Sequence, residues 1–119
     1  MYSITTAVAA ILALTLTAKA QTIRGQFTHY DIGLGACGET HNNTEMVAAI
    51  SKDRFGPSTT SRLCGRKLRI HYEDKSAEVT IVDSCQACSS DSLDLSPAAF
   101  TAIVGSLEPG RVDGTWEII

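Results

Sequence analysis

Positive charge is scarce in this sequence. Its 119 residues include ten lysines and arginines against thirteen aspartates and glutamates, which gives a formal net charge of −3. Proteins that hold a phosphate backbone use a basic patch or stripe, and no such run occurs here. We therefore expect no nucleic-acid partner. Aromatic residues are also few, at 6%, which leaves Tyr30, Tyr72 and Trp116 as candidates for stacking on a flat ligand.

The sequence also contains just one long apolar run. Ile4 to Thr17 is almost continuously apolar or small, and it is followed by Ala18-Lys19-Ala20. An apolar stretch that ends in an A-x-A site is typical of a secretory signal peptide. We expect residues 1–20 to be removed and residues 21–119 to form one secreted, extracellular domain. No later segment is apolar enough to cross a membrane, so we expect no membrane contact after cleavage.

The four cysteines include one Cys-x-x-Cys, and a second is missing. A four-cysteine zinc site usually needs two such knuckles. A thioredoxin-like redox site needs its Cys-x-x-Cys at the start of a helix, whereas Cys88 precedes the loop-like run Ser89 to Ser92. An even number of cysteines in a short secreted chain favours structural disulfides over these two alternatives. Spacing leaves three pairings of Cys37, Cys64, Cys85 and Cys88 open.

Short segments with period-two alternation predict a mainly β domain. The predicted strands are Arg24 to Tyr30, Arg66 to Tyr72, Ser76 to Asp83 and Gly114 to Ile119, and Met46 to Ser51 is a short buried strand or a turn of helix. Ser96 followed by Pro97 predicts the start of a helix, and Gly105 predicts its end. Several strands with little helix indicate a β-barrel. Asn42-Asn43-Thr44 is an N-glycosylation sequon.

Five motifs in order resemble a known family. They are Thr28-His29-Tyr30-Asp31 before Gly35-Ala36-Cys37-Gly38, then Val47-Ala48-Ala49, Cys64-Gly65-Arg66-Lys67, Val82-Asp83-Ser84-Cys85-Gln86-Ala87-Cys88, and Leu93 to Phe100. Together they resemble the double-psi β-barrel superfamily of rare-lipoprotein-A-like, barwin and expansin proteins, especially the small single-domain secreted proteins of fungi. The resemblance implies a six-stranded double-psi β-barrel with one or two short helices and a groove on one side. It also implies a Cys37–Cys64 bridge, which leaves Cys85–Cys88.

Three aspartates are candidate catalytic residues by this resemblance. Asp94 matches the general acid of related inverting endoglucanases, although Ser92-Leu93 replaces the histidine and phenylalanine that precede it there. Asp31 lies roughly where those enzymes carry their base. Asp83 matches an aspartate of lytic transglycosylases, whose histidine after an Ala-Ala pair is replaced here by Ile50. Both catalytic sets are therefore incomplete. The alternative is a structural role, in which Asp83 and Asp94 accept hydrogen bonds from backbone N–H groups.

We expect a non-catalytic, monomeric secreted protein that binds cell-wall polysaccharide in its barrel groove, without metal or other cofactor. The groove residues that we expect to contact carbohydrate are Thr28, Tyr30, Asp31, Asp83 and Asp94. Because aromatic platforms are few, the affinity should be modest. One alternative is a protein-binding module, either a cysteine-protease inhibitor or an effector. A second is a weak glycoside-cleaving enzyme of the endoglucanase or lytic transglycosylase type.

Overall fold

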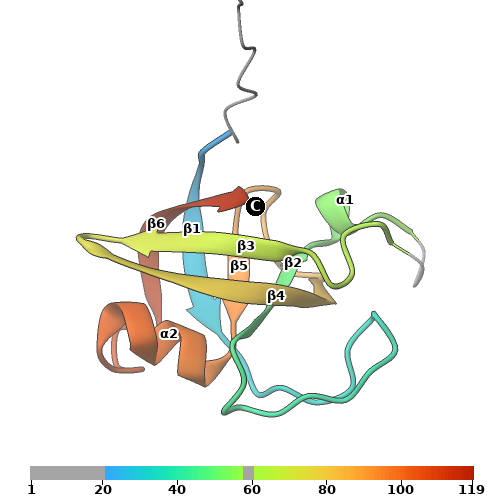
Figure 1. Ribbon diagram of the computed structural model, residues 1–119, viewed down its shortest axis with the longest axis horizontal. Helices are drawn as coiled ribbons and strands as arrows, with labels where there is room; N and C mark the ends of the chain where they lie inside the picture. Colours follow the sequence, from blue (N-terminus) through green and yellow to red (C-terminus); the bar gives the residue numbers. More distant parts are fainter. Residues whose placement is uncertain (1–20, 58–60) are drawn as a thin grey trace, which may run out of the picture.

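The computed structural model describes residues 21–57 and 61–119 (Figure 1). The predicted signal peptide, residues 1–20, lies outside these residues and stays a prediction. The elements in chain order are β1 (Ile23–His29), β2 (Val47–Ser51), α1 (Lys52–Phe55), β3 (Lys67–Tyr72), β4 (Lys75–Cys85), β5 (Leu93–Leu95), α2 (Pro97–Val104) and β6 (Arg111–Ile118). No helix in the described part of the chain is both long and apolar enough to span a membrane.

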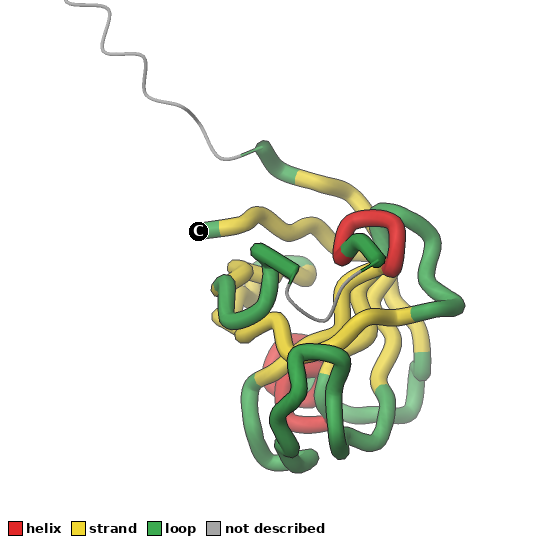
Figure 2. The backbone as a smooth tube through the Cα atoms, turned by 90° about the vertical axis from the view of Figure 1, so that its right-hand side faces the viewer, coloured by secondary structure: helices red, strands yellow, loops and turns green. Residues whose placement is uncertain are grey.

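The six strands close into a barrel in the order β1-β5-β2-β4-β3-β6. The pairs β1·β5 and β2·β4 are parallel, and the other four pairs are antiparallel. The two views show the strands around one core, with α1 near the upper end and α2 near the lower end (Figures 1 and 2). This confirms the predicted six-stranded, mainly β barrel with two short helices.

The barrel is held together by one hydrophobic core to which every strand and both helices contribute. Trp116, Phe27 and Phe100 are the largest of its side chains, and all three are fully buried. Complete burial of an aliphatic or aromatic side chain stabilises the fold by about 1.5–3 kcal/mol. The remaining core residues are Ala48, Ile50, Phe55, Leu68, Ile70, Val79, Ile81, Leu93, Leu95, Ala99 and Ile103. The strand residues of this set point inward by the alternation of a β-strand, and Phe55, Ala99, Phe100 and Ile103 come from the two helices.

A register shift in the β2·β4 pair sets the orientation of Asp83. Ala48 pairs with Ile81, but Ala49 pairs with Asp83, so Val82 is the extra residue of a β-bulge. Strict alternation would have placed Asp83 on the same side as Val79 and Ile81, both of which are in the core. The bulge reverses that alternation and turns the carboxylate outward.

Helix α2 begins and ends where its sequence predicts. The Oγ of Ser96 accepts a hydrogen bond of 3.1 Å from the backbone N–H of Ala99, and Pro97 occupies the first turn. Gly105 ends the helix in the left-handed region, at φ 98°. Phe100 and Ile103 point into the core. This local chemistry fixes the end of β5, and hence the position of Asp94 just before the helix.

All four cysteines are in disulfides. Cys37 is bonded to Cys64 across 27 residues, and Cys85 to Cys88 across three. Of the three pairings that spacing left open, this is the one that the family resemblance implied. Because every thiol is used, none remains to ligate zinc or to act as a free dithiol.

Candidate functional site

Four residues form a row across neighbouring strands. Asp83 on β4 pairs with Ala49 on β2, Ala49 pairs with Asp94 on β5, and Asp94 pairs with Thr28 on β1. Residues that pair in register project from the same face of a sheet. Ala49 lies between the core residues Ala48 and Ile50, so this face is the outer one. The two aspartates are two strand spacings apart, or about 10 Å between Cα atoms.

Asp83 is held by three hydrogen bonds. Its Oδ1 accepts from the backbone N–H groups of Ala36 and Ser84, each at 2.8 Å, and its Oδ2 accepts from the hydroxyl of Tyr30 at 3.3 Å. The loop before Ala36 lies close against it, since a Cβ on Gly35 would be 3.3 Å from the Cβ of Asp83. Both oxygens of Asp83 are therefore engaged in fixing the β1–β2 loop and Tyr30.

Asp94 is the carboxylate with the more strongly perturbed environment. Burial raises the pKa of Asp94 above its ordinary value, and the negative charge of Asp83 adds to that effect. A hydrogen bond of 2.8 Å from the hydroxyl of Thr28 to Oδ1, together with the charges of His29 and Arg111, opposes the rise. Among the described residues, Thr28 provides the one hydrogen bond that Asp94 accepts. The other oxygen of Asp94 is thus available to a ligand.

The hydroxyl of Tyr30 is affected by the charges of both aspartates. Burial raises the pKa of the Tyr30 hydroxyl, and the charge of Asp83, its hydrogen bond with Asp83 and the charge of Asp94 raise it further. The phenol is therefore a hydrogen-bond donor throughout the physiological pH range. Asp31 has different surroundings. It is exposed, and its Oδ1 accepts a hydrogen bond of 3.2 Å from the side-chain amide of Asn43.

A cleft of about 380 Å³ opens beside Asp94. Of the predicted contact residues, Thr28 and Asp94 line it, whereas Tyr30, Asp31 and Asp83 do not. Sequence reasoning missed the rest of the lining, which consists of Gln26, His29, Cys85, Ala87, Cys88, Ser89, Ser92 and Arg111. Gln26 alternates with Thr28 along β1, a signal that could have found it. Arg111 pairs with Thr28 across β1·β6, which the sequence does not reveal.

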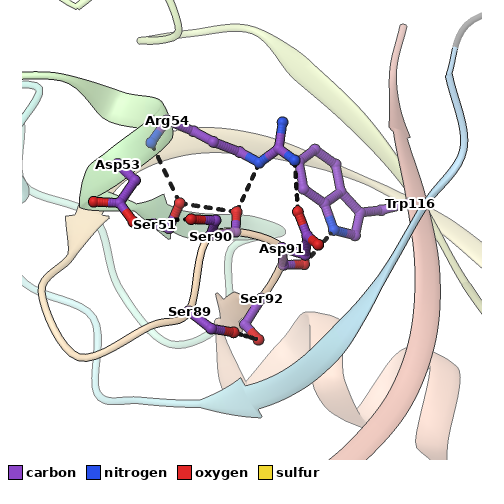
Figure 3. A network of polar contacts seen from close by, with 8 residues as sticks. All are labelled: Ser51, Asp53, Arg54, Ser89, Ser90, Asp91, Ser92 and Trp116. Carbon is purple, nitrogen blue, oxygen red and sulfur yellow. Dashed lines mark hydrogen bonds and ion pairs between the residues drawn. The ribbon is translucent and has the colours of Figure 1, made fainter.

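Arg54 of α1 contacts the loop Ser89 to Ser92, which forms one side of this cleft (Figure 3). The Nε of Arg54 donates to the carbonyl of Ser90 at 2.7 Å, and its Nη2 donates to Oδ1 of Asp91 at 2.6 Å. The guanidinium lies 5.2 Å from the ring centroid of Trp116, whose Nε1 donates to the carbonyl of Asp91 at 2.8 Å. With the Cys85–Cys88 bridge at its start, the segment Ser89 to Ser92 is held at both ends.

Two further clefts lie elsewhere on the barrel. One, of about 590 Å³, is lined by residues of β1, β3 and β6 together with Glu73 of the β3–β4 turn. The other, of about 220 Å³, lies beside the Cys37–Cys64 bridge. Among residues 21–57 and 61–119, no group of three histidine, cysteine, aspartate or glutamate side chains could hold a metal ion.

The sequon lies on the surface of the β1–β2 connection. Asn42 is exposed, and its Oδ1 accepts hydrogen bonds from the hydroxyl of Thr44 at 2.6 Å and from the backbone N–H of Thr44 at 3.0 Å. The asparagine and threonine are thus in contact with each other and accessible from solvent. Attachment of a glycan at Asn42 stays a prediction.

Comparisons with known proteins agree with this architecture. Residues 22–114 match the double-psi β-barrel family model described as "Lytic transglycolase". A homologue of the allergen Asp f 7 from Arthroderma benhamiae is 34% identical over 110 residues, which cover 80% of this chain and 38% of the relative. The chain thus spans well under half of that relative's length. A papain inhibitor from Streptomyces mobaraensis is 32% identical, and the match covers 83% of this chain and 73% of the inhibitor.

Solved structures also resemble this barrel. A Streptomyces papain inhibitor superposes with a TM-score of 0.77 and 30% identity, covering 83% of this chain and 94% of that one. The expansin of Clavibacter michiganensis superposes with a TM-score of 0.72 and 25% identity, covering 83% of this chain and 50% of that one. The family model spans almost the whole described barrel, and the chain therefore belongs to the double-psi β-barrel family described as "Lytic transglycolase".

Proposed function

We propose that this protein is secreted and binds a cell-wall polysaccharide in the Asp94 cleft without cleaving it. The observation that carries the proposal is the Thr28–Asp94 pair. It presents a partly buried carboxyl group, fixed by one hydrogen bond of 2.8 Å, to a cleft that is otherwise lined by polar side chains, Ala87 and the Cys85–Cys88 bridge. Sugar hydroxyls both donate and accept hydrogen bonds, and groups of this kind orient them.

The state of Asp83 argues against cleavage. An inverting glycosidase needs one carboxyl group as the acid and a second, unencumbered carboxylate as the base for a water molecule. Asp94, with its raised pKa, has the character of an acid. Asp83, however, has both oxygens occupied by hydrogen bonds from Ala36, Ser84 and Tyr30. Asp31, which the family resemblance matched to that base, does not line the Asp94 cleft either. Among the described residues, Asp94 is thus the one carboxylate in the lining, which supports glycan binding without hydrolysis by an inverting mechanism.

A pull-down on insoluble polymers tests this function. Wild-type protein, Asp94→Ala and the control Thr101→Ala, which changes an exposed residue of α2 outside the cleft, are incubated with chitin, cellulose and peptidoglycan. We expect retention of wild type and Thr101→Ala on at least one polymer, loss of retention for Asp94→Ala, and no release of soluble oligosaccharide. If wild type is retained on none of the three, the proposal is wrong. Release of oligosaccharide that disappears in Asp94→Asn would instead establish an enzyme.

Inhibition of a cysteine protease is the second candidate. It is favoured by the likeness to the Streptomyces papain inhibitor, which extends over 94% of that chain, and by the fixed Gln86–Asp91 loop, most of whose residues are exposed. A rigid exposed loop loses little conformational entropy when it docks on a protease. Titration of papain against a fluorogenic peptide tests it. Stoichiometric inhibition by wild type would support this function, and unchanged papain activity at a large molar excess would refute it.

A further inference from the structure

The outer face of β1 and β6 carries an unbroken stripe of polar side chains. Three residues alternate along β1 and each pairs in register with a residue of β6. The three pairs are Thr28 with Arg111, Gln26 with Asp113, and Arg24 with Thr115. At one end, Thr28 is beside Asp94 of β5. At the other end, Thr115 pairs with His71 of β3. The stripe thus runs from the Asp94 cleft to the cleft of about 590 Å³.

Gln26 joins the two clefts, because it lines both of them. Its Oε1 accepts a hydrogen bond of 2.9 Å from Nη1 of Arg111, and its Nε2 donates one of 3.4 Å to Oδ1 of Asp113. Arg111 belongs to the Asp94 cleft and Asp113 to the larger one. The side-chain amide of Gln26 is therefore held in place between residues of the two clefts.

The larger cleft offers hydrogen-bonding groups of both kinds. Its lining consists of Arg24, Gly25, Gln26, His71, Glu73, Asp113, Gly114 and Thr115. The ring of His71 is fixed by Glu117, because its Nε2 lies 2.9 Å from both carboxylate oxygens. Donors and acceptors of opposite charge alternate along the stripe, so no single sign of charge accumulates. Such a surface suits a neutral ligand rich in hydroxyl groups better than a polyanion.

We propose that the larger cleft is an extension subsite, in which a neutral polysaccharide bound at Asp94 continues past Gln26 toward Arg24 and His71. This inference rests on the proposed function. Thr28 and Arg24 are four positions apart in an extended strand, so the distance between their Cα atoms is about 13 Å. One sugar ring cannot reach both ends of that path, whereas an oligosaccharide of several rings can. Affinity should therefore increase with the length of the oligosaccharide, and the increase should depend on residues remote from Asp94.

Titration calorimetry with oligosaccharides of two and six sugars, from cellulose and from chitin, tests the subsite. We expect wild type to bind the hexasaccharide about tenfold or more tightly than the disaccharide. In Arg24→Ala, which changes a residue that lines the larger cleft and not the Asp94 cleft, the hexasaccharide should bind about 3- to 10-fold more weakly, as expected for the loss of one or two hydrogen bonds, and disaccharide binding should be unchanged. Asp94→Ala should weaken binding of both. The controls are Arg66→Ala and Thr101→Ala, which change exposed residues that line neither cleft.

The outcomes separate this inference from the proposed function. If wild type binds neither length in either series, the proposed function fails and the subsite with it. If wild type binds both lengths but equally well, or if Arg24→Ala keeps the full preference for the hexasaccharide, the subsite is wrong and the Asp94 site remains. NMR gives a second measurement. The ring signals of His71, which lines the larger cleft and not the Asp94 cleft, should shift on addition of the hexasaccharide more than on addition of the disaccharide, and equal shifts would contradict the extension.

Discussion

Thr28 and Asp94 are 66 positions apart in the chain, yet the hydroxyl of Thr28 donates a hydrogen bond of 2.8 Å to Oδ1 of Asp94. The contact exists because β1 and β5 pair in parallel, with Thr28 directly opposite Asp94. A hydrogen bond to a carboxylate favours its charged form. Thr28 therefore limits the rise in the pKa of Asp94 that burial causes.

Replacing Thr28 by valine should raise the pKa of Asp94 further. Valine has nearly the shape of threonine but lacks the hydroxyl, so the charged carboxylate loses its donor while its burial is unchanged. The pKa can be followed by NMR titration of the carboxyl carbon of Asp94. Thr28→Ser, which keeps the hydroxyl, should leave the pKa close to that of wild type. Equal pKa values in wild type and Thr28→Val would show that this hydrogen bond does not persist in solution.

Asp94→Asn should make the protein more stable at neutral pH while weakening polysaccharide binding. Because burial raises the pKa of Asp94 in the folded state, the folded protein holds a proton over a range in which the unfolded chain has lost it. The free energy of unfolding therefore falls as pH rises through that range, and the loss is complete above the raised pKa. Asparagine does not titrate and is free of this loss. Sites that serve binding are often costly to stability in this way.

Thermal melts of wild type and Asp94→Asn from about pH 3 to pH 7 measure this effect. The melting temperature of the variant relative to wild type should rise across the range. Asp113→Asn, a change of an exposed aspartate, is the control and should show no such trend. If Asp94 instead served mainly to hold the backbone, its asparagine variant would lose stability most at neutral pH, where the carboxylate is charged.

Asp83 should behave as a structural residue. Alanine at this position leaves the N–H groups of Ala36 and Ser84 and the hydroxyl of Tyr30 without their acceptor, and we expect the free energy of unfolding to fall by about 2–3 kcal/mol. Asn keeps one acceptor oxygen and should cost about 1 kcal/mol. Urea denaturation gives both values. A loss below about 0.5 kcal/mol for Asp83→Ala would mean that the residue is free to take part in binding or catalysis.

The sequence alone was sufficient for the elements whose signals are local. Alternation predicted β1, β3 and β4, and the Ser96-Pro97 start and Gly105 end predicted α2. The sequence did not predict β5, because three residues are too few to show an alternation of apolar and polar residues. This strand pairs with its neighbours β1 and β2. Sequence reasoning also missed the single turn of α1. The closing strand begins at Arg111, three residues before the predicted Gly114, because the turn at Pro109-Gly110 leads directly into the pair Thr28–Arg111.

The candidate site was predicted only in part, because local signals do not show which strands pair. The residues of its row came from the family resemblance, since Asp83, Asp94 and Thr28 lie on three strands that only the closed barrel brings together. The bulge at Val82 was not visible, because Val79, Ile81 and Asp83 alternate as if all three faced one side. Gln26 was missed although its alternation with Thr28 could have found it. Arg111 was missed because the strand pairing that places it opposite Thr28 is not encoded in local spacing.

Arg54 should control the order of the loop at the rim of the Asp94 cleft. Arg54→Ala removes its hydrogen bonds to Ser90 and Asp91 and its contact with the ring of Trp116. We expect the free energy of unfolding to fall by about 1–2 kcal/mol. We also expect faster hydrogen exchange at the amide of Ser92, which donates to the carbonyl of Ser89 within the same loop. Arg54→Lys keeps the charge but lacks the two-pronged geometry, so it should reproduce much of the exchange effect.

Arg69→Ala is the matched control for Arg54→Ala. Arg69 also pairs with a carboxylate, at 3.1 Å from Glu78, but both side chains are about half exposed, so its loss should cost less than about 0.5 kcal/mol and leave the exchange of Ser92 unchanged. Because the loop forms one wall of the Asp94 cleft and is also the surface that would dock on a protease, loosening it should weaken whichever of the two activities the protein has. Unchanged exchange at Ser92 in Arg54→Ala would show that the Cys85–Cys88 bridge alone is enough to order the loop.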